Sequence, residues 1–154
     1  MTTRDELIAS YREGPDVVER TVARLTDEQL DHRPSSGGWS PREVVNHLGD
    51  SEMISAFRVR KLLAEDSPTI QGYDEEEFAR RLHYDERPIA PSLAALRAAR
   101  ETTASILERL TDEDWSRTGT HTESGEYSVT TWMEIYARHA HDHARQIEEA
   151  LSSE

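Results

Sequence analysis

The sequence has 154 residues, and its 31 acidic side chains outnumber its 18 basic ones to give a net charge of −13. This length predicts one domain over residues 1–154, and the acidic surface disfavours nucleic acid and anionic membranes as partners. Because the chain contains no cysteine and no apolar run as long as a signal peptide or a membrane span, we exclude disulfides and thiolate metal sites and expect a cytoplasmic protein without a membrane partner.

Two capping boxes mark the first helical segments. In Thr3–Glu6 and again in Thr26–Gln29, a threonine that can cap a helix is followed three residues later by a side chain that can reach back to it. The first box begins a helix that an apolar stripe continues over residues 4–25, with a kink expected at Pro15, which lacks a backbone donor. The second begins a short helical turn that leads into a loop ending at Trp39.

The strongest start signal lies in Ser40–Glu43, where a serine cap, a proline at the first helical position and a glutamate three residues after the cap occur together. It predicts a second long helix that runs to about Glu65. Residues 66–91 then carry three prolines and an acidic run, which indicates a long connection with one short helix capped by Asp74. We expect this connection to cover part of the molecule.

The second half of the chain repeats the pattern of the first. Residues 92–110 have apolar side chains at helical spacing and predict a third long helix. A turn begins at Thr111, as one does at Thr26, residues 116–128 indicate a loop, and Ser128 caps a final helix. No alternation of β-branched residues reaches strand length, so the sequence predicts an all-α four-helix bundle with a long crossover between the second and third helices.

The final helix places histidines where its apolar stripe would otherwise continue. Between Tyr136 and Ile147 the stripe passes through His139 and His143, which lie four residues apart and therefore on the same helical face. His141 lies about 200° around the helix from His139 and should face the other way. An inward pair of this kind can hydrogen-bond to polar neighbours in a core, or it can ligate a metal ion.

His47 lies beside the apolar stripe of the second helix, among mainly inward positions such as Val44, Ser51 and Ile54. It is a candidate to meet the helix that carries the histidine pair. The alternative is an interfacial histidine with one nitrogen in water, and position alone favours that alternative.

Two sequence blocks resemble the DinB-like, or YfiT-like, family of bundle proteins, which are often described as metal-dependent hydrolases. The first is Trp39–Glu52, WSPREVVNHLGDSE, and the second is His139–Ile147, HAHDHARQI. The order and spacing of the blocks extend the resemblance over essentially the whole chain. In the family, the histidine of the first block and the two outer histidines of the second hold one divalent ion. The resemblance therefore implies a metal site at His47, His139 and His143, with zinc or nickel as the metal.

Three imidazoles would leave an open coordination position, as catalytic metal sites do. Asp50, one turn from His47, and Asp142 and Gln146, beside His143, are candidates to orient the imidazoles or relay a proton. Such residues are more often solvated polar groups on a helix face. Because ligating imidazoles must be neutral, we expect metal affinity to fall in acid, from about pH 6.5 downward.

The family includes thiol-dependent S-transferases and isomerases. The resemblance therefore implies a metal-dependent enzyme, a thiol S-transferase or a hydrolase, that acts on a small electrophilic substrate, in the first case with a low-molecular-weight thiol. The alternatives are a protein whose ion is structural or sensory, and a metal-free bundle that serves as an interaction module. We also expect a homodimer, as is common in the family, because Trp115, Trp132 and several marginal apolar positions exceed what one bundle core is expected to cover.

Overall fold

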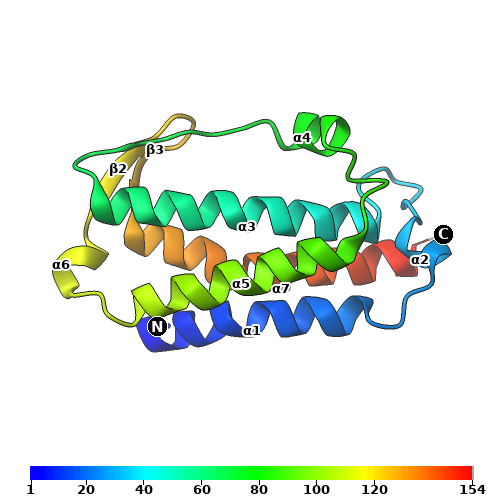
Figure 1. Cartoon of the computed structure of the whole chain (residues 1–154), viewed down its shortest axis with the longest axis horizontal. Helices are drawn as coiled ribbons and strands as arrows, with labels where there is room; N and C mark the ends of the chain where they lie inside the picture. Colours follow the sequence, from blue (N-terminus) through cyan, green and yellow to red (C-terminus); the bar gives the residue numbers. More distant parts are fainter. Residues whose placement is uncertain (154) are drawn as a thin grey trace.

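The computed structural model describes residues 1–153 and consists mainly of helices. Four helices are long: α1 (Arg4–Val22), α3 (Pro41–Ala64), α5 (Ile89–Leu107) and α7 (Val129–Ser152). Three are short: α2 (Asp27–Leu30), α4 (Glu75–Arg81) and α6 (Asp112–Trp115). The long helices form the four-helix bundle that the sequence predicts (Figure 1).

Side-chain caps begin most helices where the sequence places them. The Ser40 hydroxyl accepts a hydrogen bond from the backbone N–H of Glu43, and the Glu43 carboxylate accepts one from the Ser40 N–H, which completes the capping box before α3. Thr3, Thr26 and Thr111 form the same box before α1, α2 and α6. These caps satisfy backbone donors that the first turn of a helix leaves free.

Prolines occur in three of the long helices, and in α3 the proline is the first residue, Pro41. Pro15 lies inside α1, which continues as one helix on both sides of it, as expected. α5 begins at Ile89 and not at Ser92, so Pro91 falls in its first turn. A proline there removes no helical hydrogen bond, because the first N–H groups of a helix have no partner within it.

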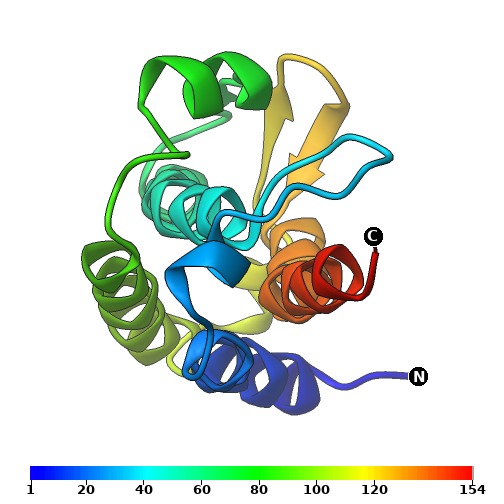
Figure 2. The same cartoon turned by 90° about the vertical axis from the view of Figure 1, so that its right-hand side faces the viewer.

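The crossover, residues 65–88, determines how the long helices are arranged. It runs back along the length of the bundle, so that α5 starts at the same end as α3 and the two helices point in the same direction (Figure 1). α1 packs mainly against α7, and α3 mainly against α5. Viewed from the end, the helices follow the order α1, α7, α3, α5 around the core, so that α3 and α7 are neighbours (Figure 2). The predicted bundle with a long crossover is confirmed.

A small three-stranded sheet is present that the all-α prediction does not include. β1 (Thr69–Ile70), in the crossover, pairs in parallel with β2 (Thr118–His121), which forms an antiparallel hairpin with β3 (Gly125–Ser128). The expected loop at residues 116–128 is therefore mostly hairpin. Its strands are too short for alternation to identify, and Gly125 adopts a left-handed φ of +83° in the turn.

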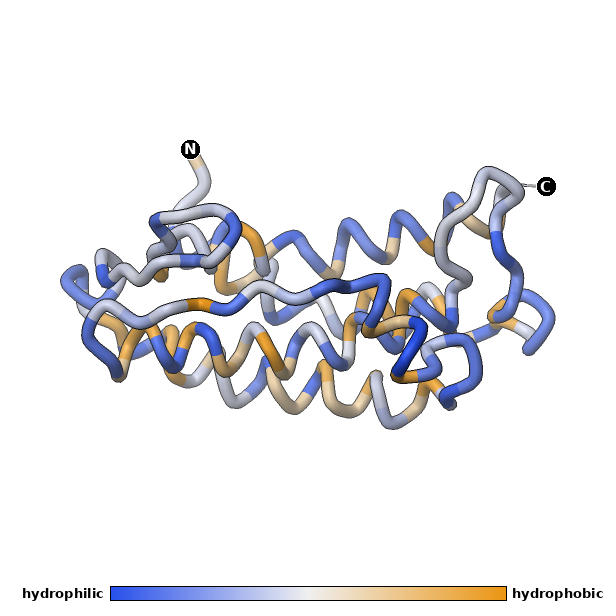
Figure 3. Tube along the Cα trace, turned by 90° about the horizontal axis from the view of Figure 1, so that it is seen from above, coloured by the Kyte–Doolittle hydropathy of each residue, from blue (hydrophilic) through white to orange (hydrophobic). Residues whose placement is uncertain are grey.

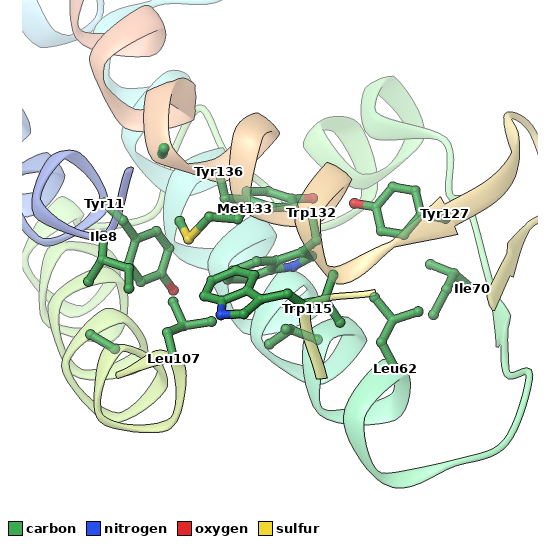
Figure 4. Close-up of a cluster of buried hydrophobic side chains, with 14 residues drawn as sticks. Ile8, Tyr11, Leu62, Ile70, Leu107, Trp115, Tyr127, Trp132, Met133 and Tyr136 are labelled. Carbon is green, nitrogen blue, oxygen red and sulfur yellow. The ribbon is translucent and has the colours of Figure 1, made fainter. Parts of the chain in front are cut away.

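Two clusters of buried side chains form the bundle core. One lies beside the sheet and includes Tyr11, Trp132 and Tyr136 (Figure 4). The other lies toward the start of α3 and includes Trp39 and Leu48. The crossover passes lengthwise over the bundle and is mostly hydrophilic (Figure 3). The apolar residues are thus concentrated on the inner helical faces, as a chain with this much charge requires.

The two tryptophans that motivated the expected homodimer are buried inside the chain's own core. Trp132 is fully buried and Trp115 is 4% exposed, so neither offers a surface to a second copy, and this part of the sequence argument is corrected. Met53 and Phe57, one turn apart on α3, are 51% and 63% exposed instead. Across residues 1–153, no helix has both the length and the apolar character that crossing a membrane requires.

Candidate metal centre

Three histidines converge where α3 faces α7. His47 comes from α3, and His139 and His143 come from successive turns of α7. One ring nitrogen from each residue lies within 4.8 Å of those of the other two. The Nε2 atoms of His139 and His143 are 3.2 Å apart, and the ring centroids of His47 and His143 are 4.8 Å apart. No further histidine or carboxylate of residues 1–153 joins this group.

His141 faces away from the other histidines, on the side of α7 that the helical wheel indicates. Its Nε2 lies 3.0 Å from the backbone carbonyl oxygen of Ser10 in α1. This histidine thus fastens α7 to α1 and is a natural control for experiments on the three that converge.

Burial keeps the converging imidazoles neutral. His47 is 1% exposed, and its burial, with a contribution from the neighbouring His143, lowers its pKa to about 3. Burial, together with the neighbouring imidazoles, lowers the pKa of His139 to about 2. Burial also lowers the pKa of His143, although its hydrogen bond with Gln146 opposes this effect. Neutral imidazole is the form that binds a metal ion, so these rings need lose no proton at pH 7.

The unpaired nitrogens of this group fit a cation. Both ring nitrogens of His47 and the Nδ1 of His139 are buried without a hydrogen-bond partner in the described part of the chain. A buried polar atom left unpaired costs about 1–3 kcal/mol. A divalent ion between the rings would engage one nitrogen of each, and imidazole nitrogens suit ions such as zinc and nickel.

Of the three residues expected to orient the imidazoles, Gln146 alone contacts one. Its Oε1 lies 2.7 Å from the Nδ1 of His143, which favours a proton on Nδ1 and leaves Nε2 to face the other rings. Asp50 instead accepts two hydrogen bonds from Arg87, at 3.0 and 3.1 Å, and Asp142 pairs with an arginine of its own helix at the surface. Neither carboxylate contacts an imidazole, and the expectation that Asp50 or Asp142 orients the imidazoles or relays a proton stays a prediction.

Aromatic rings enclose the histidines. The Trp39 ring is centred 4.9 Å from that of His47, and the Tyr136 ring 5.3 Å from that of His139. Trp39 also lines a cavity of about 270 Å³ whose other walls come from the start of α3 and from α4 in the crossover. The three histidines do not line this cavity.

A buried ion pair near the histidines has no counterpart in the sequence predictions. Glu52 of α3 is fully buried and Arg100 of α5 is 1% exposed, and the Arg100 Nε lies 3.1 Å from the Glu52 Oε1. The Tyr11 hydroxyl donates a hydrogen bond to the same oxygen at 3.0 Å. The positive charge of Arg100 contributes to the low pKa of His139. Sequence patterns could not reveal this pair, because charged residues on helices usually face solvent.

Comparisons with known proteins find relatives over most of the chain. A family model described as the DinB superfamily matches residues 10–147. A protein of Oceanobacillus iheyensis is 37% identical over 143 residues, which cover 93% of this chain and 83% of that protein. One of Geobacillus thermodenitrificans is 36% identical over 146 residues, covering 92% and 80%. Both relatives carry the name "putative metal-dependent hydrolase".

A solved structure has the same fold. The match is to YfiT from Bacillus subtilis, described as "a probable metal-dependent hydrolase with an unusual four-helix bundle topology". The TM-score is 0.90 at 31% sequence identity, and the alignment covers 96% of this chain and 85% of that one. The parallel course of α3 and α5 is a departure from the up-down-up-down order of simple bundles.

Proposed function

Because this chain belongs to the DinB superfamily, we propose that it is a metal-dependent enzyme, a hydrolase or a thiol S-transferase, that acts on a small electrophilic substrate. His47, His139 and His143 would hold one divalent ion. The observation that carries the proposal is the convergence of their ring nitrogens within 4.8 Å of one another, with His47 buried and His139 and His143 half-buried.

The residues of the chain prepare this site before an ion arrives. Burial keeps the rings neutral, and Gln146 holds the His143 ring with its Nε2 toward the others. The Trp39 and Tyr136 rings limit access of water from two sides. A bound divalent ion supplies a Lewis acid that lowers the pKa of a water or thiol ligand toward neutrality.

The donor set favours zinc or nickel. All three candidate ligands are imidazoles, which suit borderline transition metals better than magnesium or calcium. In the region from residue 1 to 153 no fourth histidine, aspartate or glutamate completes the group. Three protein ligands and one free position are typical of catalytic zinc sites, whereas structural sites usually have four protein ligands. This feature supports the catalytic hypothesis over a structural or sensory ion.

The first experiment is metal analysis of protein purified without a nickel column. We expect about one zinc or nickel ion per chain in the wild type, and its loss in His47→Ala, His139→Ala and His143→Ala. His141→Ala is the matched control, since His141 lies on the same helix but binds the Ser10 carbonyl. If that control loses the ion as completely as His139→Ala does, the assignment of ligands is wrong.

The second experiment tests catalysis. Metal-loaded protein is assayed with glutathione, mycothiol, bacillithiol or coenzyme A against small electrophiles, and separately with simple esters and amides. Turnover in wild type that disappears in His139→Ala supports the hypothesis that the protein is a metal-dependent enzyme. Equal rates in both proteins would leave the non-catalytic metal-binding or interaction module as the better explanation.

We also propose that the protein acts in the cytoplasm as a homodimer. With Trp115 and Trp132 buried, support for the dimer comes from the exposed Met53 and Phe57 on α3. Sedimentation at micromolar concentration should give twice the chain mass, and Phe57→Ser should shift the equilibrium toward monomer. A monomer in wild-type protein would remove the dimer from the proposal without affecting the metal site.

A further inference from the structure

Arg58 of α3 is a buried cation with no ion-pair partner in the described chain. It is 9% exposed. The arginines that likewise form no ion pair are all at least partly exposed: Arg20, Arg24, Arg60, Arg109 and Arg138. The other buried arginine, Arg100, is paired with Glu52. The Arg58 charge partly opposes the raised pKa of Glu75, but the Glu75 carboxylate forms no ion pair with it. Burying a guanidinium without a paired anion costs several kcal/mol, so this charge calls for an explanation.

Two neutral oxygens and one aromatic ring account for only part of the Arg58 guanidinium, whose Cζ lies 5.7 Å from the centre of the Tyr73 ring. Its Nη2 donates a hydrogen bond to the backbone carbonyl oxygen of Gln71 at 2.6 Å, and its Nη1 a long one to the Tyr136 hydroxyl at 3.5 Å. The Nε is buried and has no partner within residues 1–153. A guanidinium has five N–H donors in a planar fork, so donors remain for a ligand.

Arg58 faces α7 and the crossover, about three helical turns (roughly 16 Å) along α3 from His47. It follows His47 by eleven residues on α3, which places it about 20° away on the same helical face. Tyr136 connects the two regions, because its hydroxyl approaches Arg58 while its ring lies against His139. The Tyr127 hydroxyl points toward that of Tyr136 (Figure 4). The Tyr136 ring thus connects a buried cation and two hydroxyl groups to the histidine site.

We infer that Arg58, with the hydroxyl groups of Tyr136 and Tyr127, binds the carboxylate of a small substrate whose reactive end faces the three histidines. This inference rests on the function proposed above and adds the chemical class of the substrate. A guanidinium fork and hydroxyl donors match the planar, two-oxygen edge of a carboxylate. With a net charge of −13 the protein repels anions in general, so an anionic substrate requires a local cation of this kind.

The test observes Arg58 directly by NMR. The arginine Nε–H signals are recorded for metal-free and zinc-loaded wild-type protein, and the Arg58 signal is assigned by its absence in Arg58→Lys. Propionate should shift this signal saturably, and propionamide, which has nearly the same shape without the charge, should not. No shift with propionate overturns the inference. A larger shift with inorganic phosphate overturns the assignment to a carboxylate.

Substitutions at Arg58 measure how much the two-point contact of its guanidinium contributes to the affinity for propionate. Arg58→Lys keeps the charge but loses the two-point contact, so propionate should bind about tenfold more weakly than to wild type. This affinity is measured by calorimetric titration, because the variant has no Arg58 signal. Arg60→Lys is the matched control, since Arg60 lies two residues away and hydrogen-bonds Ala56 and Thr103. If Arg58 only fastens the crossover through Gln71, Arg58→Lys lowers the melting temperature while propionate shifts no signal in wild type, and the inference fails.

Measuring the zinc content distinguishes a failure of this inference from a failure of the proposed function. If zinc binds and turnover occurs but propionate leaves the Arg58 signal unmoved, the inference alone is wrong. If propionate binds at Arg58 in protein that takes up no zinc, the anion site stands and the proposed function fails.

Discussion

Acid should unfold the metal-free protein while its histidine site is still neutral. The folded chain excludes protons from His47 down to about pH 3 and from His139 down to about pH 2. In the unfolded chain both side chains return to their ordinary pKa of about 6.5. Below pH 6.5 the unfolded state therefore binds more protons than the folded state. Stability is full above pH 6.5 and is lost progressively as the pH falls toward 3.

The size of the effect follows from these values. At pH 5.5 each excluded proton destabilises the folded state by about 1.4 kcal/mol relative to pH 7.5. Together, His47 and His139 contribute about 3 kcal/mol over this interval. Small domains are stable by only about 5–15 kcal/mol, so two buried histidines remove a substantial fraction of that stability within two pH units.

Urea unfolding at pH 7.5, 6.5 and 5.5 in the presence of a chelator measures the decrease in the free energy of unfolding. His139→Gln removes one excluded proton, so this variant should lose about 1.4 kcal/mol less than wild type over the same range. The control is His83→Asn, because His83 is exposed and has a left-handed φ of +55° that asparagine tolerates. Carboxylates and surface ion pairs are common to all three proteins, so the differences isolate His139.

The low pKa values of His47 and His139 also change the pH at which we expect the metal to be released. The sequence alone predicts that affinity falls from about pH 6.5, whereas the buried site resists protonation until far lower pH. We expect bound zinc to persist until the fold is lost. Release of zinc at pH 6 with unchanged helical circular dichroism would refute the argument, as would equal pH dependence of stability in wild type and His139→Gln.

Two further substitutions test the site and the packing. Gln146→Ala should weaken zinc binding about 10- to 100-fold in a chelator competition without changing the fold, because the His143 Nδ1 loses its partner; unchanged affinity would show that this contact does not orient the ring. Gly49→Ala should lower the unfolding free energy by about 1–3 kcal/mol, because the added Cβ would lie 2.8 Å from the Ser92 Cβ and 2.9 Å from its Cα. A melting temperature equal to that of wild type would mean that α3 and α5 separate there at no cost.

Helix starts were predictable because caps are local chemistry. Ser40–Glu43 determines the beginning of α3 through hydrogen bonds among four consecutive residues, and the threonine boxes act in the same way. The sheet is different, because β1 has two residues and becomes a strand only by pairing with Thr120 and His121, about 50 residues away. No local pattern encodes such a pairing, so the hairpin and β1 were missed.

The site was predictable in part, for a related reason. Helical periodicity alone places His139 and His143 on one face and His141 on another, as the structure has them. The position of His47 left two alternatives open, because which helix it meets depends on the topology of the bundle. Periodicity places Arg58 on the inward face of α3, but the groups that surround the buried charges of Glu52 and Arg58 come from segments distant in sequence, so the pattern could not reveal their partners.

The free energy cost of the unpaired histidine nitrogens argues against a metal-free bundle in which the three histidines have no role. The unpaired nitrogens of His47 and His139 each cost about 1–3 kcal/mol, and their sum approaches the whole stability of a small domain. Apolar side chains of similar size at these positions would remove that cost and leave the helices unchanged. Metal binding at structural zinc sites contributes about 10–16 kcal/mol, more than enough to offset it. A metal-free interaction module would have no reason to retain this arrangement, whereas a protein that folds around an ion would depend on it.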